Sequence, residues 1–191
     1  MKSFFVASTL LACAPFCHAQ SSPPASTKEQ PTFSVETADD RPRVVRPAAL
    51  PNTVLEALKS DEAVKSCLKD NPLDPGKSLG SWFIASVIHL AGPNEVDLVV
   101  VPSFQGEESM CFESVSGIGL FWIFRNNGGK QYQLALRTYG NQIVILPSRT
   151  KDYRNVRSDT IGQAGRYLTE STFRFNGNSY VVAQERTEEQ R

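Results

Sequence analysis

Histidine and cysteine side chains are well suited to acid–base or nucleophilic chemistry near neutral pH, and this 191-residue chain has two histidines and four cysteines. His89 precedes Asp97 in a segment typical of two strands joined by a short turn. A carboxylate across such a hairpin can orient an imidazole as a general base, so one functional hypothesis is a small hydrolase using His89 with Asp97. The other interpretation, which we favour, is a histidine at a strand end that is hydrogen-bonded or solvated.

Metal ligands are scarce once a predicted N-terminal signal is removed, because only His89, Cys67 and Cys111 remain of the histidines and cysteines. Structural zinc sites use four such ligands. Two cysteines in an oxidising compartment predict one disulfide, Cys67–Cys111, closing a loop of about 45 residues and stabilising the fold by about 4 kcal/mol. The sequence does not fix the Cα separation on which this bridge depends. We expect no metal and no cofactor.

The stretch Gly76-Lys77-Ser78-Leu79-Gly80 matches the G-x-S-x-G pattern of hydrolase nucleophile elbows. In those enzymes the serine lies at a sharp turn from a strand into a helix. Ser78 instead follows a proline-containing loop and precedes a predicted strand, so we assign no catalytic residue to this motif.

Aromatic side chains concentrate at Phe121, Trp122 and Phe124, and such a row can stack sugars or bases. We therefore consider a sugar-binding module, using Trp122 or Trp82, as a third class of function. A core role is favoured, with Phe121 as the more exposed ring. A three-residue hairpin loop at Asn127-Gly128-Gly129 would place on one shared face Leu120, Trp122, Phe124, Tyr132, Leu134 and Leu136.

Residues 1–19 have the three parts of a secretory signal peptide: Lys2 near the start, an apolar run from Phe4 to Phe16, and small residues before the cut. Cleavage is expected between Ala19 and Gln20. The alternative is lipid attachment at Cys13, because the residues before it loosely match a lipoprotein signal. The run is too short for a membrane span, which needs about 20 apolar residues. We expect a periplasmic or secreted protein.

The charge balance excludes some partners, because 20 basic and 20 acidic residues give a formal net charge of zero. Such a chain has no overall attraction to nucleic acid or to acidic membranes. We expect no nucleic-acid partner and no membrane span, and the sequence leaves the oligomeric state open.

The helix and strands that would position these residues are predicted to follow an N-terminal tether. Residues 20–49 are rich in proline and polar residues and predict a disordered tether, residues 50–186 a single domain, and residues 187–191 a frayed end. Apolar residues with helical spacing predict one helix from about Pro51 to Lys69. Alternating patterns predict seven strands: Ser81–Leu90, Val96–Val101, Ile118–Arg125, Gln131–Thr138, Gln142–Leu146, Tyr167–Phe175 and Ser179–Gln184. The predicted fold class is α+β, with one N-terminal helix packed on an antiparallel sheet of about seven strands.

An ordered set of short motifs resembles an uncharacterised family of small exported bacterial proteins over about residues 50–182. The motifs are Asp97-Leu98-Val99-Val100, Cys111, Phe121-Trp122-Ile123-Phe124-Arg125, Tyr132-Gln133-Leu134, Asp152-Tyr153-Arg154-Asn155-Val156 and Phe173-Arg174-Phe175-Asn176-Gly177-Asn178-Ser179-Tyr180. The resemblance implies export and a β-rich fold, and no established activity.

In some members of this family, the loop before the Asp-Leu-Val strand is similar to the calcium-binding loops of FG-GAP and VCBS repeats. Here the corresponding run is His89–Leu98, in which His, Ala and Pro replace three oxygen donors. A calcium ion needs six or more oxygen ligands, so we expect that calcium does not stabilise this protein.

The sequence thus favours an exported, non-enzymatic binding or interaction domain, with an unknown protein or envelope polymer as partner. The hydrolase using His89 with a carboxylate is the alternative.

Overall fold

The computed structural model describes residues 33–36, 46–103, 111–112, 118–129, 131–162 and 165–190. The predicted signal peptide, its cleavage site at Ala19 and Gln20, the alternative lipid site at Cys13 and most of the predicted tether lie outside these residues. Two short strands, at residues 33–36 and 47–48, fall within the span predicted as a tether.

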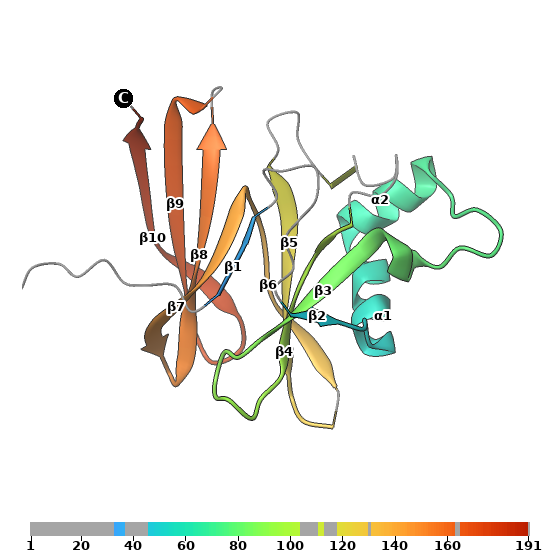
Figure 1. Cartoon of the computed structure of the whole chain (residues 1–191), viewed down its shortest axis with the longest axis horizontal. Helices are drawn as coiled ribbons and strands as arrows, with labels where there is room; N and C mark the ends of the chain where they lie inside the picture. Colours follow the sequence, from blue (N-terminus) through green and yellow to red (C-terminus); the bar gives the residue numbers. More distant parts are fainter. Residues whose placement is uncertain are drawn as a thin grey trace, which may run out of the picture.

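Ten strands form two antiparallel sheets of five strands each in the described part of the chain. One sheet has the order β1-β7-β8-β9-β10 and the other β2-β3-β4-β5-β6, as Figure 1 shows. The strands are β1 (Phe33–Glu36), β2 (Pro47–Ala48), β3 (Phe83–Ile88), β4 (Asp97–Pro102), β5 (Gly119–Asn126), β6 (Tyr132–Gly140), β7 (Gln142–Thr150), β8 (Tyr153–Gly162), β9 (Tyr167–Phe175) and β10 (Tyr180–Glu189).

The predicted fold class is therefore wrong: the protein is mostly β, with two sheets and short helices instead of one helix on one seven-stranded sheet. The difference arises at Gly140 and Asn141, where the chain leaves one sheet for the other. Asn141 N donates to Asp159 O at 2.7 Å and Ser158 Oγ donates to Tyr139 O at 2.6 Å. The turn is thus bonded to β8 and does not close a hairpin between β6 and β7.

The β2–β6 sheet is the middle of three layers, with the helices on one face and the β1–β10 sheet on the other (Figure 1). This arrangement explains why β4 is apolar on both faces, since every residue of β4 is buried. The core under the helices includes Val54, Leu58, Val64, Trp82, Phe83, Val100, Phe112, Leu120, Trp122 and Phe124. The core between the sheets includes Ile88, Leu90, Val99, Val101, Phe121, Ile123, Leu136, Ile143, Ile145, Val156, Phe173, Phe175 and Tyr180.

Two α-helices, α1 (Asn52–Ser60) and α2 (Glu62–Asp70), replace the single predicted helix from Pro51 to Lys69. Asp61 interrupts the helix with an extended backbone, ψ 135°, and its carboxylate accepts a hydrogen bond from Ala63 N at 2.9 Å. An aspartate that caps a new helix competes with continuation of the old one. A 3-10 turn, η1 (Leu79–Trp82), then leads into β3.

The β5–β6 hairpin contains a register shift that the sequence did not reveal. Ile123 lies opposite Leu136, whereas Phe124 lies opposite Leu134, so β6 has one extra residue. Leu134 lies opposite Phe124, and Tyr132 packs against the cluster that contains Trp122, as the shared face predicts. The bulge turns Leu136 toward the core between the sheets, so the predicted face is wrong for Leu136. Phe121, expected to be the more exposed ring, is completely buried.

The sequence predicts a strand that ends before Pro147 and no strand at β8. Instead β7 continues through Pro147 to Thr150 and turns at Lys151 and Asp152, whose φ angles are 51° and 68°. At the end of the chain, Thr187–Glu189 pair with β9, whereas the sequence predicted fraying there.

Candidate functional site

Four turns gather at one end of the two sheets, which we call the loop end: residues 89–96, 127–129 with 131, 151–152 and 176–179. They follow β3, β5, β7 and β9, and they lie together at the bottom of Figure 1. Because all strands here are antiparallel, every second connection must return to the same end of the sheets. Loops carried on such a scaffold are the usual place for binding residues.

Asp97, at the start of β4, is the buried centre of the loop end. Its side chain is completely buried, and its two oxygens accept hydrogen bonds from Leu90 N at 2.8 Å and Asn126 N at 2.9 Å. Burial raises the pKa of Asp97 above its ordinary value of 3.8, although the two backbone donors oppose that rise. The carboxylate therefore joins the turn after β3 to the end of β5.

His89 has a different partner from the one the hydrolase hypothesis requires. Its Nδ1 lies 2.7 Å from the carbonyl oxygen of Glu95, within its own turn. The structure brings His89 and Asp97 near each other, but the Nδ1 of His89 contacts a backbone carbonyl and the Asp97 oxygens accept from two backbone amides, so the hydrogen bond that would orient the imidazole is not formed. Among the described residues, no group of three His, Cys, Asp or Glu side chains could hold a metal ion.

Two basic side chains of the β7–β8 hairpin link three of the turns. Arg149 Nη1 donates to Ala91 O at 2.5 Å and also to the carbonyl of Asp152. Lys151 Nζ donates to the carbonyl of Asn176. These bonds fix the turn after β7 to the turns after β3 and β9.

The fourth turn is held by Arg125 and Gln133. Arg125 Nε donates to Asn127 Oδ1 at 2.9 Å, and its guanidinium lies 5.1 Å from the ring centroid of Phe175. Gln133 Nε2 donates to Asn178 Oδ1 at 3.3 Å. Beneath them, Tyr180 donates its hydroxyl proton to a backbone carbonyl of β8, and burial raises the pKa of that phenol.

The exposed surface of the loop end is rich in amides and nearly balanced in charge. Its exposed polar side chains are Asn94, Glu95, Asn127, Gln131, Lys151, Asp152, Asn176 and Asn178. Side chains of this kind donate and accept hydrogen bonds without a large charge to desolvate. The arrangement suits recognition of a polar partner better than acid–base chemistry.

Sequence reasoning found His89 and Asp97 and missed Arg125, Arg149 and Lys151, which hold the turns together. Each lies at or near a turn. Their partners are backbone carbonyls and side chains of other hairpins, and no spacing within the sequence reveals such contacts.

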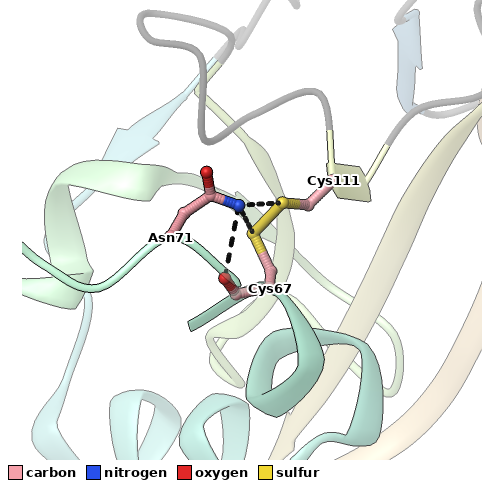
Figure 2. The surroundings of a disulfide bond; sticks show 3 residues. All are labelled: Cys67, Asn71 and Cys111. Carbon is pink, nitrogen blue, oxygen red and sulfur yellow. Dashed lines mark hydrogen bonds between the residues drawn. A yellow bond between two sulfur atoms is a disulfide. The ribbon is translucent and has the colours of Figure 1, made fainter. Parts of the chain in front are cut away.

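The predicted disulfide is confirmed: Cys67 of α2 and Cys111 are bonded, with their Cα atoms 5.7 Å apart. Figure 2 shows Asn71 beside the bridge, with Nδ2 donating to Cys111 Sγ at 3.2 Å and to Cys67 O at 3.4 Å. The next residue, Phe112, is buried against Trp82, Phe83 and Trp122. The bridge and this ring attach the chain between β4 and β5 to the helical layer.

Two other sequence candidates are not part of a site. Trp82 is 3% exposed and Trp122 is completely buried, so the aromatic row is core and offers no surface for stacking a sugar. Ser78 precedes η1 and a strand, and the strand-to-helix turn of a nucleophile elbow is absent from the chain around it.

The fold and site define a class, a helix-covered pair of antiparallel sheets whose hairpin turns form a linked surface at one end. Comparison with known proteins identified no matching protein-family model, curated protein or solved structure. Within the described residues, no helix has the length and apolar character needed to cross a membrane.

Proposed function

We propose that this protein is an exported, non-enzymatic binding domain whose loop end engages a protein or an envelope polymer outside the cytoplasm. The observation that carries the proposal is the linkage of the four turns through Asp97, Arg149, Lys151 and Gln133. Turns fixed in this way present their exposed amides in one arrangement, which lowers the entropy lost on binding.

Export is supported by two features. Residues 1–19 have the pattern of a signal peptide, and disulfides such as Cys67–Cys111 persist mainly in oxidising compartments. The resemblance to small exported bacterial proteins agrees with this location.

The rival function is a hydrolase that uses His89. The Nδ1 of His89 lies 2.7 Å from the carbonyl oxygen of Glu95, while the Asp97 carboxylate accepts hydrogen bonds from Leu90 N and Asn126 N. A broad hydrolase screen with wild-type protein and His89→Ala separates the two functions. Activity that is present in the wild type and lost in His89→Ala would overturn the binding proposal.

The binding proposal is tested by capture from an envelope extract of the cells that make the protein. Asn94→Arg alters the loop end, and Asn52→Arg is a matched control on α1, since both asparagines are exposed. We expect a component retained by the wild type and by Asn52→Arg, and lost with Asn94→Arg. Equal retention by all three proteins would contradict recognition through the loop end.

A further inference from the structure

A pocket opens at the edge of the β2–β6 sheet, beside α1. Strand β2 pairs with β3 at only two positions, Pro47 opposite Ser86 and Ala48 opposite Ala85. Beyond Ala48 the chain leaves the sheet toward α1, while β3 continues back to Phe83. The space between them is a pocket of about 480 Å³, which we call the edge pocket. Its lining includes Ala48, Leu50, Leu55, Ser78, Gly80 and Ile84.

The lining of the edge pocket differs from the surface around it. None of the lining residues carries a charge, and the only polar side chain among them is the Ser78 hydroxyl. On the outer side of α1, by contrast, Glu56 and Lys59 form an exposed ion pair. A charged group would lose hydration in the pocket without gaining a partner, so the lining selects an uncharged, aliphatic group.

Small residues keep the edge pocket open. A Cβ atom built at Gly80 would lie 3.5 Å from Ser78 Oγ and 3.7 Å from Leu55 Cδ2, which are ordinary contacts. Since Gly80 does not have a positive φ, its backbone does not require glycine. A larger side chain would fit the backbone and fill the space, which is the usual way in which a core closes such a gap.

We propose that the edge pocket binds the aliphatic chain of an uncharged amphipathic molecule, with the polar group of the ligand hydrogen-bonded to Ser78. The pocket volume is within the range of about 300–1,000 Å³ found for ligand sites. The site is separate from the loop end, because His89 lies five positions after Ile84 along the chain of β3, which is about 17 Å of strand. If the edge pocket does not bind the ligand, the proposal for the loop end is therefore unaffected, and the reverse also holds.

The test is a titration of the disulfide-bonded mature protein with 1-butanol, 1-hexanol and 1-octanol, followed by NMR shifts of the lining methyl groups. Each added methylene should lower Kd about fourfold, because burial of a methylene contributes about 0.8 kcal/mol. Gly80→Leu should weaken 1-octanol binding at least fiftyfold. The matched control is Gly162→Leu in β8, since a Cβ atom at Gly162 meets nothing within 4 Å, and its Kd should equal that of the wild type.

If Gly80→Leu does not fold, Ser78→Ala replaces it, because Ser78 is exposed. Loss of one hydrogen bond should weaken 1-octanol binding about fivefold and leave the factor per methylene unchanged. The proposal is overturned if 1-octanol causes no saturable shift, if Kd does not depend on chain length, or if Gly162→Leu weakens binding as much as Gly80→Leu.

Discussion

At the scale of single residues, two buried aspartates join elements that are distant in the sequence, which their sequence context does not indicate. The Asp61 side chain is 6% exposed and pairs with Arg137 Nε at 2.8 Å, while accepting hydrogen bonds from Trp122 Nε1 and Ala63 N. Asp97 accepts hydrogen bonds from two backbone amides, one in the turn after β3 and one at the end of β5. A buried carboxylate is tolerated only with such partners, so each aspartate fixes the elements that supply them.

Asp61→Ala should lower the free energy of unfolding by about 2 kcal/mol, because it removes a helix cap and two charge-assisted contacts. Asp74→Ala is the control: its carboxylate is 69% exposed and pairs only with Lys77 one turn away, so the loss should stay under about 0.5 kcal/mol. Urea unfolding followed by tryptophan fluorescence measures both. Equal losses for the two variants would show that Asp61 does not join the helices to the sheet.

Asp97→Asn should also destabilise the fold by about 2 kcal/mol at neutral pH, because an amide offers one acceptor oxygen where the carboxylate offers two. The difference in the free energy of unfolding between wild type and variant should depend on pH. The folded-state pKa of Asp97 lies above its ordinary value of 3.8, so the ionised carboxylate opposes folding and protonation relieves this. The free energy by which the wild type is more stable than Asp97→Asn should therefore grow as the pH falls through the raised pKa, and level off below 3.8.

The measurement is a series of urea unfolding curves for wild type and Asp97→Asn between about pH 3.5 and pH 7.5. Taking the difference between the two proteins removes the titration of all other groups to first order. A wild-type advantage that shrinks on acidification would contradict the account of Asp97.

At the scale of elements, the sequence predicted the strands better than their arrangement. Strands β3, β4, β5, β6 and β9 lie close to their predicted ranges, because alternation and turn residues are local signals. The break at Asp61 and the bulge in β6 were missed, since each depends on contacts with distant residues such as Arg137 and Ile123. The site shows the same limit: Asp97 was found, and its partners Leu90 N and Asn126 N were not.

Gly140 lies where the chain crosses from one sheet to the other, and a side chain there would disturb β8. A Cβ atom there would lie 2.4 Å from Ser158 Oγ and 3.0 Å from Asp159 O, so Gly140→Ala must displace a buried hydroxyl and press on the backbone of β8. We expect a loss of about 2 kcal/mol, typical of overpacking. Gly162→Ala is the matched control, since a Cβ atom at that site of β8 meets nothing within 4 Å. Thermal and urea unfolding of both variants checks this, and equal stabilities would contradict the close approach.

At the scale of the whole molecule, the packed layers of helices, middle sheet and outer sheet support the four turns. The disulfide contributes to this frame by joining α2 to the chain between β4 and β5. The core between the sheets reaches the loop end through Leu90, Phe175 and Tyr180, so the turns rest on packed side chains. This is the physical basis for our proposal that the loop end binds a partner with little loss of conformational entropy.

Reduction of Cys67–Cys111 should lower the free energy of unfolding by about 4 kcal/mol, because it frees a loop of some 45 residues in the unfolded chain. The strand pairing should persist, since the hairpins close without the bridge. Intact mass after alkylation, with and without reductant, reports the bridge, and urea unfolding reports its contribution. Two alkylated thiols in the unreduced, denatured sample would contradict the pairing.

The most direct test of the central claim is site-specific photo-crosslinking in the cells that make the protein. A photoreactive residue is placed at Asn94 or Asn178 on the loop end, or at Asn52 or Lys65 on the helices; all four positions are exposed. We expect one crosslinked species from Asn94 and Asn178 and none from Asn52 and Lys65. Crosslinks confined to the helix positions, or equal from all four, would contradict binding through the loop end.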